Sequence, residues 1–169
     1  VTDMSEMFKD AINFNQNISS WVTSKVTNMS GMFENASSFN HNISSWITSN
    51  VTNMASMFKD TNFNQDITLW DVSAVTNMAS MFKNAISFNQ NISNWDISNV
   101  NNFTNMFYNT INLDNSSNIN AYEILSSYRN NNNFNRTSAG FTIVSLSEFD
   151  NKTDLRNAIN QGIETDAIS

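Results

Sequence analysis

The chain has 169 residues, a formal net charge of −7 and neither cysteine nor proline. With a sequence pI of about 4.4 it has no basic stripe for nucleic acid or an anionic lipid surface, so we expect neither as a partner. No disulfide framework is possible, and no apolar run reaches the roughly 18 residues of a membrane span, so we expect no direct membrane insertion by this segment.

One pattern is repeated along most of the chain. It reads Val-Thr-x-Met-x-x-Met-Phe, then a turn, then Phe-Asn-x-x-Ile-Ser/Thr-x-Trp, and its copies begin at Val1, Val26, Val51, Val75 and Val100. The fifth copy decays after Phe107. Spacings of 25, 25, 24 and 25 residues are typical of a solenoid, which works by presenting a long stacked surface. Near-identical copies leave little room for one irreplaceable catalytic residue, so we expect a non-enzymatic protein.

Each copy divides into two halves with different apolar spacing. In the first half the spacing fits one face of a short helix, as in Val26, Met29, Met32, Phe33 and Ala36. The second half, as in Ile43 to Trp46, indicates a short strand or an extended turn. The sequence therefore predicts an α/β fold: a leucine-rich-repeat-like solenoid of about 4.5 repeats, each with one short helix and one short strand.

We expect the solenoid to occupy residues 1–112 and a capping region to occupy residues 113–169. Within the latter, 121–129 has the pattern of an amphipathic helix, 141–144 that of a strand, and 155–159 that of a helix ended by Gly162. A small α+β cap over the open end of the solenoid is the interpretation we favour, because terminal repeats need a polar outer face. An independent domain is the alternative.

Two columns of recurring residues predict ladders between copies. Asparagine makes up 33 of the 169 residues and suits turns, so the Asn of each Phe-Asn pair is expected to bond to the turn of the next copy. These residues are Asn15, Asn40, Asn64 and Asn89. The tryptophans are Trp21, Trp46, Trp70 and Trp95. Stacked in the core they form a structural ladder; facing solvent they would suit a glycan or a protein partner.

No cofactor or metal site is indicated. His41 is the only histidine and stands where other copies have Gln16, Gln65 and Gln90, so it is expected to be a polar surface variant. With one histidine and no cysteine a zinc site is not expected. The aspartates have the spacing of no calcium loop.

The positions that differ between copies are the candidate interaction surface. They precede each Trp (Ser20, Ser45, Leu69, Asn94), follow it (Val22, Ile47, Asp71, Asp96), or form the row Gln16, His41, Gln65 and Gln90. Leu69 is apolar where its equivalents are polar. It is either an exposed contact point or a filler of the space left by the missing residue of the third copy.

The segment Phe-Asn-Gln-Asn-Ile-Ser-Asn-Trp-Asp-Ile-Ser-Asn-Val at 88–100, followed by Asn-x-Phe-x-x-Met-Phe, resembles the bacterial surface protein repeat of mycoplasma-type surface lipoproteins and BspA-like leucine-rich-repeat proteins. The resemblance covers residues 1–110. It implies a cell-surface or extracellular protein, anchored through an upstream segment. Because residue 1 already lies within the repeat pattern, we also expect this chain to be part of a longer array.

The expected function is adhesion or protein binding, with a host protein or a second copy of the chain as partner. The alternatives are a self-assembling surface or filament component and a glycan-binding module that uses the Trp ladder.

Overall fold

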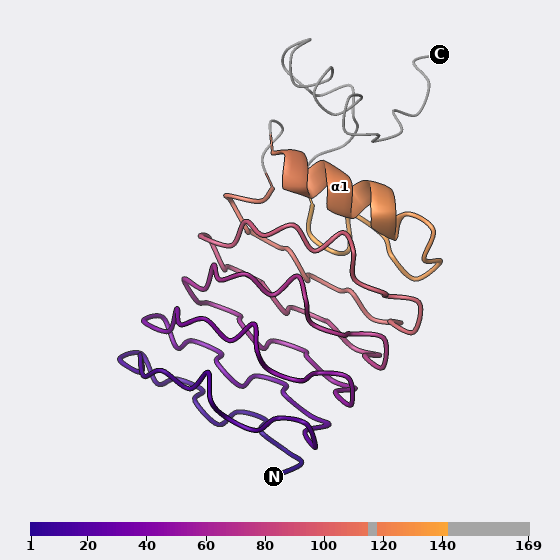
Figure 1. The fold of residues 1–169 in the computed structure, drawn as a ribbon. Coiled ribbons are helices and arrows are strands. Elements are labelled where there is room, and N and C mark those ends of the chain that lie inside the picture. The colour runs from indigo at the N-terminus through magenta and orange to yellow at the C-terminus, as the bar shows by residue number, and fades with distance from the viewer. Residues whose placement is uncertain (115–117, 142–169) are drawn as a thin grey trace, which may run out of the picture.

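The computed structural model describes residues 1–114 and 118–141 (Figure 1). Among these residues there is one helix, α1 (Ile119–Tyr128), and no strand; the copies share only isolated parallel bridges that run Asp3–Asn28–Asn53–Asn77–Asn102. The expected α/β leucine-rich-repeat-like solenoid is therefore wrong, since the copies contain neither a helix nor a sheet. The expected strand at 141–144 and helix at 155–159 lie outside the described residues, apart from Phe141.

The copies are instead chains of tight turns that lie one above another, from the N-terminus at one end to α1 at the other (Figure 1). The first turns of each copy replace the expected helix. The amides of Met7, Lys9 and Ala11 donate to the carbonyls three residues before them, at 3.1–3.4 Å. The intervening amides donate to the next copy: Met4 N–H to Asn28 O and Phe8 N–H to Met32 O, both at 2.9 Å.

Two positions in each copy prevent a continuous helix because their backbone is left-handed. Glu6 (φ 55°) and Asp10 (φ 61°) mark them in the first copy. In the following copies the first position is taken by Gly31, Ser56, Ser80 and Asn105, and the second by Asn35, Asp60, Asn84 and Asn109, all with positive φ. Left-handed residues interrupt a right-handed helix, and Gly, Asn and Asp adopt this conformation at least cost.

The second half of each copy is also turned rather than extended. The amide of each Trp donates to the carbonyl of the Ile three residues before it, as in Trp46 N–H to Ile43 O at 3.1 Å. A second turn follows, closed by the amide of Val26 on Thr23 O at 2.8 Å in the first copy. The Ile-x-x-Trp segment lacks the strict apolar–polar alternation of a strand, and this feature of the sequence agrees with a turn.

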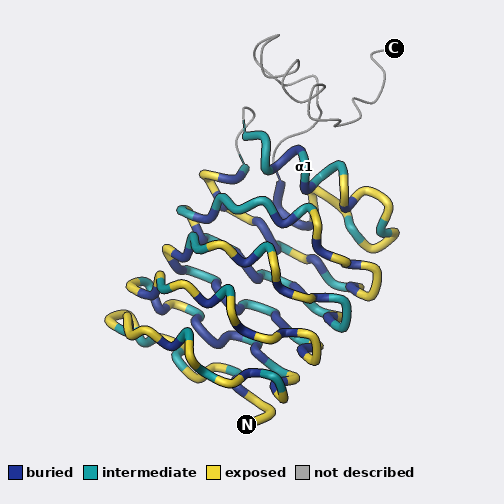
Figure 2. The backbone as a smooth tube through the Cα atoms, viewed as in Figure 1, coloured by how far each residue is buried: buried dark blue, intermediate teal, exposed yellow. Residues whose placement is uncertain are grey.

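Buried residues recur in each copy along the stack (Figure 2). Columns of Met, Phe, Val and Ile make up most of this core. Phe58 is fully buried, with its ring centroid 5.7 Å from Phe33, 5.8 Å from Phe82 and 4.1 Å from Phe63 of its own copy. Stacked rings of this kind add to the hydrophobic stabilisation that burial provides. No copy buries its own Met-Phe face alone, so the stability of each depends on its neighbours.

The chain after the fifth copy satisfies the polar groups that another copy would have satisfied. Tyr128 of α1 donates its hydroxyl to Ile92 O at 2.9 Å, where an indole N–H serves in the copies below. Further round the same end, Asn105 N–H donates to Ser138 O at 2.6 Å and Phe107 N–H to Ala139 O at 2.7 Å. Gly140 (φ +97°) lies so close to Tyr108 that an added Cβ would be 2.4 Å from its backbone nitrogen.

Candidate protein-binding edge

One edge of the stack is formed by the turns around the tryptophans, residues 16–24, 41–49, 65–73 and 90–98; we call it the Trp-turn edge. Each of its first turns is fixed by a side-chain oxygen that accepts the amide two residues later, at 2.8–3.0 Å. The residues that supply this oxygen are Asn17, Asn42, Asp66 and Asn91. Such turns hold the backbone locally, so the side chains at their tips are presented on a rigid support.

The tryptophan rings lie beneath this edge. Trp46, Trp70 and Trp95 are 3–4% exposed, and Trp21 is partly buried. The indole N–H groups of the three buried rings donate to Ile carbonyls of the preceding copy at 3.1–3.3 Å. Trp46 and Trp70 stack with centroids 6.5 Å apart and planes 2° apart. Since glycan stacking needs an exposed ring face, the three buried rings provide no such platform.

The Asn column forms bonds between copies. Asn40 Oδ1 accepts from Asn64 N–H at 2.9 Å, and Asn64 Oδ1 accepts from Asn89 N–H at 2.8 Å. Asn118 and Asn120, beside and within α1, donate to Asn89 Oδ1 at 2.7 and 3.0 Å and so continue the column.

The neighbouring row joins the same network. Gln65 and Gln90 donate to the Asn one copy below, at 3.2 and 2.9 Å, and His41 Nε2 lies 3.0 Å from Asn15 O. These three side chains are half-buried, whereas Gln16 is exposed. A shallow polar hollow of about 220 Å³ lies beside His41, lined also by Asn17, Ser19, Asn42, Ser44 and Ser45.

The positions on either side of each Trp are all exposed: Ser20, Ser45, Leu69 and Asn94 before it, and Val22, Ile47, Asp71 and Asp96 after it. Three of them are large apolar residues. Val22 is 82% exposed, Ile47 54% and Leu69 82%. Leu69 therefore does not fill the space left by the missing residue of the third copy.

The first two copies reverse the usual order of polar and apolar residues at this edge. Val22 and Ile47 are exposed while the next residues, Thr23 and Thr48, are only 2% exposed. In the third and fourth copies an exposed Asp precedes a buried Val72 or Ile97. The reversal is visible in the sequence as Trp-Val-Thr and Trp-Ile-Thr against Trp-Asp-Val and Trp-Asp-Ile, but the repeat pattern alone did not predict it.

The buried threonine hydroxyls are paired with backbone groups of the next copy. Thr23 Oγ1 donates to Ile47 O at 3.0 Å and accepts from Ile47 N–H at 2.9 Å, and Thr48 Oγ1 donates to Asp71 O at 2.9 Å. Burial of a hydroxyl is tolerated only with such partners. The reversal therefore leaves the buried hydroxyl satisfied and places an apolar side chain at the surface.

Three carboxylates on the edge are held in the ionised form. Hydrogen bonds from Thr68 lower the pKa of Asp66, and those from Ser73 lower the pKa of Asp71. Hydrogen bonds from Ser98 likewise lower the pKa of Asp96, although the nearby Asp71 carboxylate opposes this. A charged acceptor is favoured by the donors that surround it.

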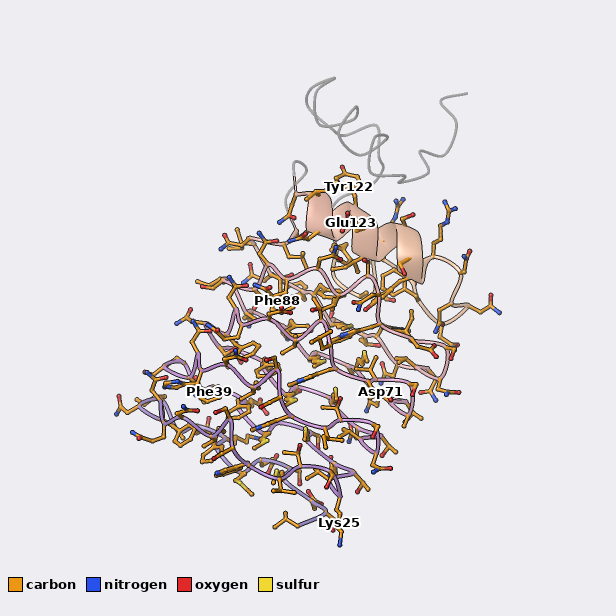
Figure 3. The ribbon with its side chains drawn as sticks, viewed as in Figure 1. Lys25, Phe39, Asp71, Phe88, Tyr122 and Glu123 are labelled. Atoms are coloured by element: carbon orange, nitrogen blue, oxygen red, sulfur yellow. The ribbon has the colours of Figure 1, made fainter. Side chains whose placement is uncertain are left out.

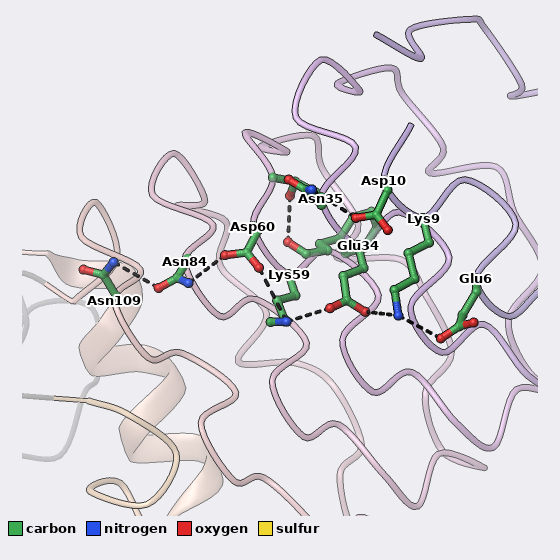
Figure 4. Close-up of polar contacts among 11 residues, drawn as sticks. Glu6, Lys9, Asp10, Glu34, Asn35, Lys59, Asp60, Asn84 and Asn109 are labelled. Carbon is green, nitrogen blue, oxygen red and sulfur yellow. Dashed lines mark hydrogen bonds and ion pairs between the residues drawn. The ribbon is translucent and has the colours of Figure 1, made fainter. Parts of the chain in front are cut away.

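The opposite edge carries a network that the sequence analysis did not foresee (Figure 4). Lys9 Nζ lies 3.0 Å from Glu6 and 3.4 Å from Glu34, and Lys59 Nζ lies 2.6 Å from Glu34 and 3.5 Å from Asp60. A column of side-chain hydrogen bonds follows it, from Asn35 to Asp10, from Asn84 to Asp60 and from Asn109 to Asn84. Its two lysines are paired with Glu6, Glu34 and Asp60, and the bonds between copies hold this edge together.

Neither a metal site nor a membrane span is found in the part of the chain that the structure describes. No group of three or more His, Cys, Asp or Glu side chains within residues 1–114 and 118–141 is placed to hold a metal ion. The helix in that part, α1, is too short to cross a bilayer.

Stacked near-identical copies, held by ladders and bearing an exposed edge that varies from copy to copy, define a repeat protein. The chain belongs to the family described as "Mycoplasma protein of unknown function, DUF285", whose sequence model matches residues 1–68 and 48–149. A search of curated proteins found no match, and neither did a search of solved structures.

Proposed function

We propose that this chain is a non-enzymatic repeat protein that binds a protein partner through the Trp-turn edge. The observation that carries the proposal is the exposed apolar patch of Val22, Ile47 and Leu69. Single exposed apolar residues are common on protein surfaces and need no explanation. Here two of the three, Val22 and Ile47, are each followed by a buried threonine. Core packing does not require this arrangement.

Continuity of the patch supports its use as one contact. The hydrogen bonds of Thr23 with Ile47 and of Thr48 with Asp71 hold the three turns in adjacent copies. Covering one large aliphatic side chain stabilises a complex by about 1.5–3 kcal/mol, so three such side chains on turns of adjacent copies are enough to act as the centre of an interface.

A cell-surface location is part of the proposal. It rests on the resemblance of the repeat to mycoplasma-type surface lipoproteins and BspA-like proteins, and on membership of a Mycoplasma family. Adhesion is the corresponding role, because a repeat stack offers an extended, rigid surface that tolerates variation at exposed positions.

The proposal is tested by binding of the fluorescently labelled chain to cultured epithelial cells, measured by flow cytometry over a range of concentrations. The patch variant carries Val22→Thr, Ile47→Thr and Leu69→Asn, the last being the residue type found at Asn94. The matched control removes exposed isoleucines that are 45–58% exposed at the opposite edge: Ile12→Thr, Ile86→Thr and Ile111→Thr.

We expect saturable binding by the wild-type chain, a loss of about tenfold or more in the patch variant, and unchanged binding in the control. Equal binding by the patch variant and the wild type would refute the proposal. Light scattering after size-exclusion chromatography serves as the second measurement. A mass that grows with concentration in the wild type but not in the patch variant would assign the patch to self-association instead.

A further inference from the structure

The Trp-turn edge changes its chemistry along the stack. Its apolar side chains belong to the first three copies, through Val22, Ile47 and Leu69. Its exposed carboxylates belong to the third and fourth copies, through Asp66, Asp71 and Asp96. Figure 3 shows Lys25 at the N-terminal end of the stack and Asp71 further along it. The edge therefore has an apolar end beside a lysine and an anionic end.

The carboxylates of this edge differ from Glu6, Glu34 and Asp60 of the opposite edge in having no cation beside them. Glu34 and Asp60 lie within 3.5 Å of a lysine ammonium. Among the described residues no lysine or arginine makes an ion pair with Asp66, Asp71 or Asp96; their oxygens accept from the hydroxyl and amide groups of their own turns instead. Their charge remains available to a partner.

Asp71 and Asp96 occupy the same position in adjacent copies, and the Asp71 carboxylate opposes the lowering of the pKa of Asp96. Two neighbouring like charges on a rigid edge are unfavourable in the free protein. A cation placed between them removes that repulsion, so the anionic end favours a positively charged group over a neutral one.

The length of the edge restricts what can reach both ends. Successive turns are separated by about 5 Å, so the distance from the first to the fourth copy is about 15 Å. An extended peptide covers about 3.3 Å per residue and spans that distance with five or six residues. A short segment is therefore long enough to place apolar side chains on one end and a charged side chain on the other.

We infer that the partner presents such a segment, apolar in one part and ending in lysine or arginine, along the Trp-turn edge. The apolar part covers Val22, Ile47 and Leu69, and the basic part lies against Asp71 and Asp96. Lys25 repels a basic residue at the other end, which gives the segment one direction. The inference rests on the function proposed above and specifies the chemistry of the partner.

The test uses a library of random dodecapeptides displayed on phage, selected against the immobilised full chain. Each enriched peptide is then synthesised and its dissociation constant measured by fluorescence anisotropy at low and high salt. The charge variant is Asp71→Asn with Asp96→Asn. Asparagine keeps the turn, because Asn17, Asn42 and Asn91 accept the amide two residues later at equivalent geometry, 2.8–3.0 Å.

The matched control removes the same charge away from this edge, through Asp3→Asn with Asp10→Asn. Both positions are occupied by asparagine in the next copy, as Asn28 and Asn35. We expect enriched peptides to combine aliphatic residues with lysine or arginine. The charge variant should bind them about tenfold more weakly and with less dependence on salt, as expected for the loss of two exposed ion pairs. The control should bind like the wild type.

Three results overturn the inference: no enriched peptide, enrichment of neutral or acidic peptides, or equal binding by the charge variant and the wild type. Failure of this inference can be distinguished from failure of the proposed function. If the patch variant loses binding to cells while the charge variant keeps it, protein binding through the edge stands and the basic partner is excluded. If neither variant affects binding to cells, both proposals fail.

Discussion

Removing one oxygen atom from Tyr128 tests whether α1 takes the place of a further copy. Tyr128 is fully buried, and burial raises the pKa of its hydroxyl, so the group stays a neutral donor. It donates to Ile92 O at 2.9 Å, the role that Trp95 Nε1 has towards Ile67 O one copy below. Tyr128→Phe keeps the ring and deletes this bond.

The change in the free energy of unfolding depends on whether another donor still bonds to Ile92 O. The Trp95 amide still donates to that carbonyl at 3.2 Å, so the oxygen is not left without a partner. The loss is then that of one net hydrogen bond, about 1 kcal/mol, and not the 1–3 kcal/mol of an orphaned buried group. For a chain of this size about 1 kcal/mol corresponds to a fall of about 2–4 °C in Tm.

The measurement is urea unfolding followed by tryptophan fluorescence, with calorimetry for Tm. Tyr108→Phe is the matched control, because Tyr108 is 52% exposed and undergoes the same chemical change. We expect the control to differ from the wild type by less than about 0.5 kcal/mol. A free energy of unfolding unchanged in Tyr128→Phe, or lowered by more than about 3 kcal/mol, would refute the reasoning about this bond.

Three further changes have defined outcomes. Leu69→Asn should leave the free energy of unfolding within about 0.5 kcal/mol of wild type, since the side chain is 82% exposed, while binding to cells falls; a large loss of stability would show that Leu69 is structural. Asp71→Asn should reduce the loss of stability on acidification. The folded-state pKa of Asp71 is lowered by Ser73, so its contribution is present above about pH 4 and disappears as the pH falls through that lower pKa. Unfolding curves of both proteins from pH 7 to pH 2 that run parallel would contradict this. Gly31→Ala should destabilise by about 1–2 kcal/mol in urea, because φ at this position is +61°, and no change would exclude a left-handed Gly31.

The exposed residue after each Trp differs between copies because the turn that follows it is stabilised in two different ways. Asp71 and Asp96 fix their own turns by accepting the amide two residues later, at 3.0 Å. Val22 and Ile47 have no such acceptor, and in their copies a buried threonine bonds to the next copy instead. The same turn is thus stabilised in two ways, and the exposed residue after the Trp is an aspartate in one and an apolar residue in the other.

The period of the sequence by itself determined which residues share a column. Equivalent residues of adjacent copies, 24 or 25 positions apart, contact one another, as Trp46 does with Trp70 and Asn64 with Asn89. Periodicity is sufficient for this because equivalent residues of stacked copies must meet. It also identified the exposed positions on either side of each Trp, since variation among otherwise identical copies falls where no neighbour restricts the side chain.

Only the tertiary structure decided the backbone within a copy. Met-x-x-Met-Phe has the apolar spacing of a helix, but every second amide of that segment bonds to a carbonyl in the next copy, as Phe8 N–H does to Met32 O at 2.9 Å. A pattern of apolar residues reports which side is buried and not which partner each amide has. The left-handed residues, the reversed order at Thr23 and Thr48, and the place of Tyr128 all depend on such partners from another copy, so local sequence cannot specify them.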